Sequence, residues 1–167
     1  RVVSSEFESI PHVIEDTPIV VSNLRQLEIK LPNEEEQKIV TVDLEGAGEV
    51  TGKVMEEKSG IEILNKDQHV LTMMEDAKIT VEMQVDLNRG YIPSEVNEKY
   101  VEDIGTIAVD AAFSPIKRVK YNIESTRVGQ RNDYDKLNLE IYTNGTISPE
   151  DALAEAAKIA KDHFTIF

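Results

Sequence analysis

The segment at residues 77–87 constrains the fold of this chain more than any other, because apolar and polar side chains alternate along it without a break. In "AKITVEMQVDL" every second residue from Ile79 to Leu87 is apolar, and the residues between them are polar. Successive side chains of a strand point to opposite faces of a sheet, so a period of two is typical of a strand. The sequence therefore predicts a half-buried strand here.

Shorter runs of similar character predict further strands, two of which should form a hairpin. Residues 119–124 and 137–142 both alternate, and we expect them to pair around a loop at residues 129–136, "GQRNDYDK". Four other short segments are strand candidates because they alternate or are rich in β-branched and apolar residues. These candidates are residues 39–44, 61–64, 69–73 and 106–113.

Two segments have helical features. Within residues 15–27, Thr17 followed by proline resembles a helix N-cap, and although the β-branched residues 19–21 also permit a strand, we expect a short helix. The Ser-Pro pair at residues 148–149 predicts the start of a longer helix. Three alanines in its apolar stripe would permit close approach by another helix. The stripe consists of Leu153, Ala156, Ala157, Ala160, Phe164 and Phe167, of which the first five are the candidates for an interface. Together these elements predict an α+β fold.

Three segments are interpreted as turns or solvated charge. The glycines of "GAGEVTG" at residues 46–52 match no phosphate-binding spacing and predict a flexible turn. The polar run "NEEEQK" at residues 33–38 also predicts a turn, and the charges at residues 56–58 are interpreted as solvated.

Composition argues against several classes of protein. The 167 residues include 18 Lys and Arg against 32 Asp and Glu, and a net charge of −14 argues against non-specific binding to DNA. There is no cysteine, which excludes disulfides and thiolate sites. No apolar run approaches the roughly 18 residues of a transmembrane helix. We therefore expect no membrane association and no direct binding of nucleic acid, and a cytoplasmic location is compatible with the absence of cysteine.

The residue pattern offers little support for catalysis. His12, His69 and His163 are far apart in sequence and lack the spacing of metal ligands, so we expect structural or surface roles for them. The nucleophile elbow, the P-loop and the dinucleotide-binding glycine pattern are all absent. A carboxylate hydrolase has only the abundance of Asp and Glu in its favour. We expect no cofactor, no metal and no active site in this chain.

Positive charge gathers at residues 117–136, where six basic residues stand against three acidic ones. In this window Asp133 and Asp135 could form an ion-pair network with Arg127, Arg131 and Lys136 that orders the hairpin loop. A solvated hairpin tip is the simpler interpretation. A recognition surface is the functional one, because a fixed arginine can bind carboxylates with two hydrogen bonds.

Residues 109–160 closely resemble the alpha subunits of bacterial-type DNA-directed RNA polymerase. The motifs "SPIKRVKYNIE", "TRVGQR", "DYDKL" and "TNGTISPEDAL" occur in the order of that family. Upstream, "EFESIPHVIED", "SNLRQLEIKL", "GIEILN" and "RGYIPSE" also follow the family order. The resemblance is weak at residues 46–59. It departs from the family pattern at "NRGYIP", which lacks one glycine, and at "TPIVVSNL".

The resemblance implies a division of the chain. In this family the N-terminal domain has a dimerisation subdomain built from both of its ends and a β-rich insertion between them. Residues 1–117 would form the insertion and residues 118–167 the second half of the dimerisation subdomain. The first half, and the separate C-terminal domain, are expected to lie outside this sequence.

The resemblance also implies partners. The alpha dimer nucleates assembly by docking the beta and beta-prime subunits, which carry the catalysis, so this chain would be a non-catalytic part of a nucleotidyltransferase. Arg25, Val109, Arg127 and Lys136 match the docking surface of the family, and the stripe of the last helix would join the dimer interface. The alternative is a stand-alone acidic β-rich module that binds another protein.

Overall fold

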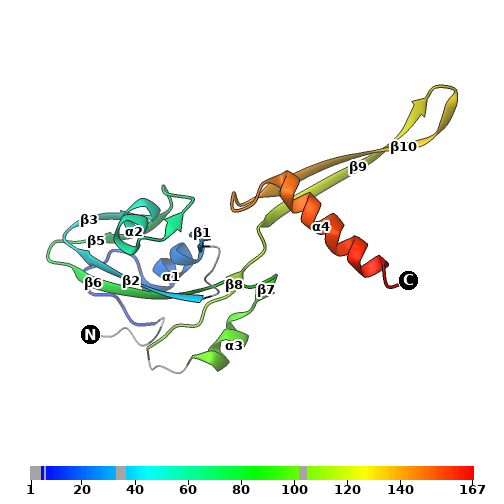
Figure 1. Cartoon of the computed structure of the whole chain (residues 1–167). Coiled ribbons are helices and arrows are strands. Elements are labelled where there is room, and N and C mark those ends of the chain that lie inside the picture. Colours follow the sequence, from blue (N-terminus) through cyan, green and yellow to red (C-terminus); the bar gives the residue numbers. More distant parts are fainter. Residues whose placement is uncertain (1–4, 6, 33–36, 102–104) are drawn as a thin grey trace. The chain divides into compact units, whose positions relative to one another are not determined.

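The structure of the chain, a computed structural model, describes residues 5, 7–32, 37–101 and 105–167, except for the side chains of residues 128 and 132. It divides into two compact units, Arg1–Phe113 and Ser114–Phe167 (Figure 1). All buried apolar side chains that the structure describes lie between Val13 and Ala77, in the first unit. Strands in antiparallel pairs and separate helices confirm the predicted α+β fold. No described helix is long and apolar enough to span a membrane.

The described part of the first unit consists of short helices and four antiparallel strand pairs, β2–β6, β3–β5, β1–β4 and β7–β8. Its elements are α1 (Thr17–Arg25), β1 (Ile29–Lys30), β2 (Gln37–Glu45), β3 (Gly48–Thr51), α2 (Gly52–Ser59), β4 (Glu62–Ile63), β5 (His69–Met73), β6 (Lys78–Asp86), β7 (Tyr91–Ile92), α3 (Ser94–Asn97), a 3₁₀ helix (Glu98–Tyr100) and β8 (Ala111–Ala112).

The alternating segment forms β6, which confirms the prediction, and its partner is β2. In the register Val42 lies opposite Val81, and Leu44 lies opposite Ile79. Val42 and Leu44 are buried. The apolar residues of β6, which alternate with its polar residues, are half-buried against the same core. Leu87 falls beyond the end of the strand and is exposed. The β2–β6 strand pair therefore covers the core with one face, as the period-two alternation of its side chains requires.

The helix predicted within residues 15–27 is confirmed as α1, although it begins one residue earlier than the prediction placed it. Asp16 occupies the N-cap position, and Thr17 already belongs to the helix. Thr17 is buried, and its hydroxyl donates a hydrogen bond to the Glu8 carbonyl. Val20 is buried as well, so the helical spacing of the apolar residues prevails over the β-branched preference.

The flexible turn predicted at residues 46–52 is confirmed only for the bend at residues 46–47 and is wrong for the rest of the segment. Residues 48–51 form β3, which pairs with β5, and Gly52 begins α2. A Cβ added to Gly52 would lie 2.7 Å from the Asn65 carbonyl oxygen, so only glycine fits this approach of two backbones. Met55 anchors the helix in the core, and Gly60 ends it with a φ of 70°. The charges at residues 56–58 lie on α2, where Glu56 pairs with Lys66 at 2.6 Å.

Three other strand candidates and one turn have mixed outcomes. The candidates at 61–64 and 69–73 are confirmed as β4 and β5. Of residues 106–113 only Ala111–Ala112 form a strand, which pairs with β7. Residues 33–36 of the predicted polar turn lie outside the described residues, and residues 37–38 begin β2.

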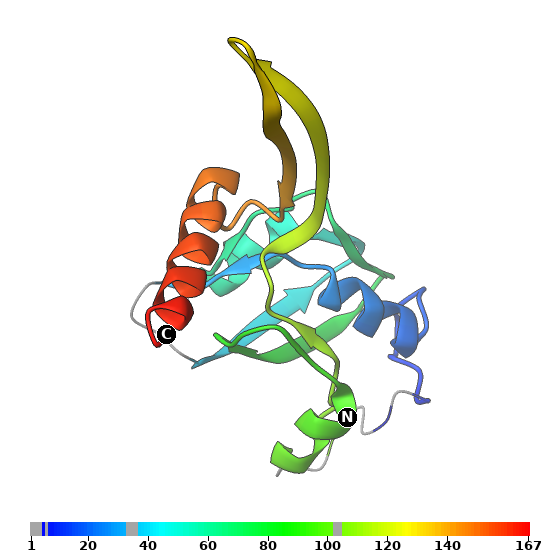
Figure 2. The ribbon, with the colours of Figure 1, turned by 90° about the vertical axis from the view of Figure 1, so that its right-hand side faces the viewer.

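The second unit is a long hairpin followed by a helix: β9 (Ile116–Val128), β10 (Arg131–Thr143) and α4 (Pro149–Phe164). The predicted pairing is confirmed, with Tyr121 opposite Leu139. The predicted loop is too long, because the turn between the strands consists of residues 129–130 and the remaining loop residues belong to β10. Gly129 has a φ of 65°, a conformation that two-residue hairpin turns require and glycine adopts at little cost. Figure 2 shows the twist of this hairpin.

Candidate partner-binding surfaces

Two of the four predicted docking residues, Arg25 and Val109, are linked in the first unit through Asp110, the neighbour of Val109, although they are far apart in sequence. Arg25 is the last residue of α1, and its guanidinium donates a hydrogen bond to the Asp110 carboxylate at 2.9 Å. Val109 precedes Asp110, and its carbonyl accepts a hydrogen bond from the Asn97 side chain at 2.8 Å. The structure thus joins the end of α1 to the segment before β8 through one ion pair.

Asp110 is the centre of this arrangement, and sequence reasoning missed it. Its other oxygen accepts a hydrogen bond from the Ser94 backbone N–H at 2.9 Å. The nearby Asp110 carboxylate raises the pKa of the Tyr91 hydroxyl. The hydrogen bond from the Ser94 N–H, together with the neighbouring Tyr91 hydroxyl and the charge of Arg25, lowers the pKa of Asp110 below its ordinary 3.8. The only sequence signal was an acidic residue inside the apolar run "TIAVDAAF".

The other two predicted docking residues, Arg127 and Lys136, lie on the hairpin of the second unit. The Arg127 side chain donates from Nε to the Gly129 carbonyl at 2.8 Å. Lys136 lies in β10, opposite Glu124 of β9. Among the described side chains, no ion pair joins these two cations or Arg131 to Asp133 or Asp135. The predicted ion-pair network is therefore not seen in the described part of the hairpin.

The two faces of the hairpin differ in chemistry. On one face the cross-strand pairs are polar or charged, with Lys120 3.6 Å from Glu140 and the Arg118 guanidinium 4.4 Å from the centre of the Tyr142 ring. The other face is apolar and, except for the partly covered Ile141, exposed; Tyr121 is 72% accessible. Its cross-strand pairs are Val119 with Ile141, Tyr121 with Leu139 and Ile123 with Leu137.

The last helix, α4, is also largely exposed. The Ser148 hydroxyl accepts a hydrogen bond from the Asp151 backbone N–H at 3.1 Å, which confirms the predicted cap. No residue of α4 is buried. The predicted dimer stripe is exposed at every position, and Phe164 is 74% accessible. Its members are Leu153, Ala156, Ala157, Ala160 and Phe164.

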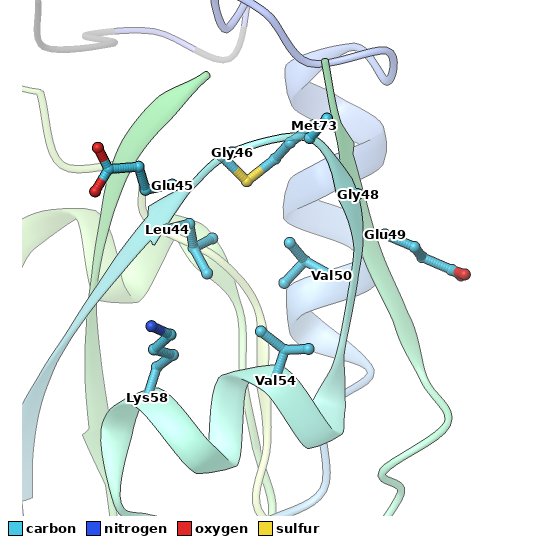
Figure 3. Close-up of a pocket in the computed structure, with 10 residues that line it drawn as sticks. Leu44, Glu45, Gly46, Gly48, Glu49, Val50, Val54, Lys58 and Met73 are labelled. Atoms are coloured by element: carbon cyan, nitrogen blue, oxygen red, sulfur yellow. The ribbon is translucent and has the colours of Figure 1, made fainter. Parts of the chain in front are cut away.

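The first unit also has a small hollow of about 120 Å³ beside the turn between β2 and β3. Leu44, Val50 and Val54 form its apolar lining (Figure 3). Lys58 extends from α2 toward Leu44, whereas the Glu49 carboxylate points away from the hollow (Figure 3). The hollow is far smaller than the several hundred Å³ of typical ligand sites, and it gathers no convergent polar groups. Nowhere in the described ranges do three potential metal ligands converge.

The three histidines have structural partners or lie at the surface. His69 lies between two carboxylates, with Nε2 2.7 Å from Glu15 and Nδ1 2.8 Å from Glu49. His163 contacts the Ile159 carbonyl of its own helix at 2.8 Å. His12 is exposed and has a positive φ of 60°. These contacts give the histidines no arrangement typical of catalysis or metal binding.

Comparison with known proteins identifies the family. Residues 1–114 match the family described as RNA polymerase Rpb3/RpoA insert domain. The chain is 49% identical over 165 residues to the DNA-directed RNA polymerase subunit alpha of Treponema pallidum, with 99% of the chain and 47% of that protein covered. The same subunit of Leptospira biflexa is 44% identical, with 99% and 51% covered, and that of Borreliella burgdorferi is 43% identical, with 97% and 47% covered.

These relatives share one description, and the chain spans about half of their length. The similarity extends through both units, since it covers nearly the whole chain. The match to the insert domain alone accounts for more than half of the residues. This chain therefore belongs to the family of bacterial DNA-directed RNA polymerase alpha subunits.

Proposed function

We propose that this chain is part of a non-catalytic assembly subunit of DNA-directed RNA polymerase in the cytoplasm. The subunit forms a dimer, and the dimer docks the beta and beta-prime subunits. The names of the relatives support this role over that of a stand-alone binding module. The chain itself contributes surfaces for assembly rather than catalytic groups.

One observation carries the proposal: the second unit exposes two apolar surfaces. A protein with 30% charged residues and a net charge of −14 has ample polar side chains to cover a solvated hairpin. The hairpin nevertheless presents a continuous apolar face, and α4 presents an apolar stripe with three alanines. Contiguous exposed apolar surface of this kind marks sites of protein association.

This chemistry supports a division of roles along the chain. The insertion, residues 1–117, has its core in the first unit, Arg1–Phe113, and extends two residues into β9. Residues 118–167 belong to the dimerisation subdomain, whose apolar surfaces contact partners. Within the subdomain, the stripe that includes Ala157 contacts the second copy of the subunit. The alanines allow the helix backbones to approach closely.

The docking residues have two kinds of role. Arg25, Arg127 and Lys136 bind acidic or carbonyl groups of the large subunits. Complementary charges of this kind orient two proteins relative to each other as they associate. Val109 supplies apolar contact beside them. Arg127, which is held to the Gly129 carbonyl, is the more strongly oriented of the two hairpin cations.

Capture of the beta and beta-prime subunits tests the proposal. Full-length protein that contains this sequence is compared with its Arg25→Ala/Lys136→Ala variant, and Lys78→Ala serves as the control because Lys78 is an exposed cation of β6. We expect the double variant to bind about tenfold more weakly or worse, since truncated interface cations often cost 1 kcal/mol or more each.

The possible outcomes distinguish failure of the proposed assembly function from failure of the assigned docking residues. Failure of the unsubstituted protein to capture either large subunit would overturn the assembly function. Normal capture by the double variant would leave the function intact and remove both residues from the docking surface. Weakening by Lys78→Ala of the same size would show that capture depends on total charge rather than on these positions.

A further inference from the structure

The carboxylate of Asp110 connects two helices of the first unit. One of its oxygens accepts from the Arg25 guanidinium at the end of α1, and the other accepts from the Ser94 N–H at the start of α3, each at 2.9 Å. Contacts to both oxygens from different directions fix the orientation of this carboxylate, so it is a rigid point of attachment for Arg25.

The Arg25 side chain remains accessible while it is held. Its side chain is 42% exposed, although one of its NH₂ groups contacts Asp110. A guanidinium has five N–H donors in one plane, so the remaining donors can bind a second acceptor without loss of the first. A free arginine would lose conformational freedom when a partner immobilised it, and prior attachment reduces that loss.

We propose that Asp110 is a positioning residue for assembly: it holds the Arg25 guanidinium ready to bind a carboxylate or carbonyl group of a large polymerase subunit. The docking surface then comprises the end of α1, Tyr91 and the segment around Val109. This inference rests on the proposed function, because it assumes that Arg25 contacts a large subunit. It goes further in assigning a role to Asp110 and in making the ion pair part of the surface.

A purely structural role for Asp110 is the competing explanation, and the chemistry of asparagine separates the two. Asp110→Asn retains an oxygen that can accept from the Ser94 N–H, so the link to α3 can persist. The amide NH₂ cannot accept a hydrogen bond from Arg25, so the positioning of the guanidinium is lost. The substitution therefore removes one contact of the carboxylate and can preserve another.

The test is a double-mutant cycle on full-length protein, with the dissociation constant for the beta and beta-prime subunits as the measurement. The variants are Asp110→Asn, Arg25→Ala and the two combined. Asp43→Asn is the matched control, because Asp43 is an exposed aspartate of β2 that accepts a hydrogen bond from the Thr80 hydroxyl at 2.6 Å. Thermal unfolding and hydrogen exchange at the Ser94 amide report on the fold.

We expect Asp110→Asn to weaken binding about two- to tenfold, the range that corresponds to losing the benefit of one ordered side chain. In the Arg25→Ala background the same substitution should have no further effect, because Asp110 acts through Arg25. Asp43→Asn should leave binding unchanged.

Several results would overturn the inference. Binding by Asp110→Asn equal to that of the unsubstituted protein would do so, as would an equal loss with and without Arg25. Weakened binding accompanied by faster exchange at Ser94 would assign Asp110 a structural role instead. If the unsubstituted protein bound no large subunit, the proposed function itself would fail, which is a distinct result from loss in Asp110→Asn alone.

Discussion

At the scale of single residues, His69 has the most constrained chemistry in the first unit. Both ring nitrogens face carboxylate oxygens, those of Glu15 and Glu49. A neutral imidazole has one N–H, so only the imidazolium can donate to both. Glu15 also accepts from the backbone N–H of Thr72 at 2.7 Å and from its hydroxyl at 2.8 Å. This cluster ties the segment before α1 to β3 and β5.

Because of this cluster, the free energy of unfolding should fall both in acidic and in alkaline solution. Burial raises the pKa of Glu15, but the hydrogen bonds from Thr72 and His69 outweigh it and lower the pKa from 4.5 to about 2. The Glu15 contribution is therefore present above pH 4.5 and is lost as pH falls toward 2. Hydrogen bonds to Glu15 and Glu49 raise the pKa of His69 above 6.5, so its contribution is present below 6.5 and is lost as pH rises through the raised value.

Glu15→Gln should consequently destabilise the protein most between about pH 4.5 and 6.5, where both groups are charged in the folded state. The difference from the unsubstituted protein should shrink in more acidic solution and in alkaline solution. Urea unfolding at about pH 3, 5.5 and 9 measures it. Glu45→Gln, which removes an exposed carboxylate of β2, is the control. A difference that stayed constant over this range would contradict the prediction.

At the scale of secondary-structure elements, the strength of the local pattern decided which elements could be predicted. β6 and the β9–β10 hairpin have many alternating residues, and each was predicted with its partner or its face. α2 was missed because its glycine start resembles a turn and few of its side chains are apolar. Tertiary contacts form it, through Met55 in the core and the approach of Gly52 to the backbone of Asn65. Such contacts are not visible in local periodicity.

The cap of α4 yields a prediction at this scale. The Ser148 hydroxyl accepts from the Asp151 N–H and donates to the Asp151 carboxylate at 2.7 Å. Ser148→Ala should destabilise the helix by about 1 kcal/mol, because an amide at its N-terminus loses its acceptor. The first turn should then show faster amide hydrogen exchange. Ser148→Asp should retain slow exchange, since aspartate also caps helices. Equal exchange in all three proteins would show that the cap contributes nothing.

At the scale of the whole molecule, the two units differ in how far sequence could locate their surfaces. The family resemblance assigned Arg25 and Val109 to one docking surface. In the structure Arg25 is joined to Asp110, the neighbour of Val109, and no periodicity of the sequence indicated this contact. The pairing of residues 119–124 with residues 137–142 could be predicted, so the apolar face was implicit in their alternation, whereas the register depends on the short turn at residues 129–130, which was not predicted. The roles of Arg127 and Lys136 remain predictions, because docking depends on a partner surface.

The exposed stripe of α4 gives the prediction that concerns the assembled molecule. In the full-length protein, Ala157→Glu should raise the dimer dissociation constant by about a hundredfold, because a carboxylate would be buried between closely packed helices without a partner. Glutamate forms helices well, so α4 itself should persist, which circular dichroism would verify. Lys158→Gln is the control: it shifts the net charge by the same amount on another side of α4. Sedimentation of the three proteins measures the effect.

An intact dimer in Ala157→Glu would place the stripe outside the dimer interface, and dissociation by Lys158→Gln would attribute the effect to charge instead. Because the stripe is exposed at every position, only its removal from water by a second copy gives Ala157→Glu a large cost, so the size of the shift itself measures how closely the two helices approach.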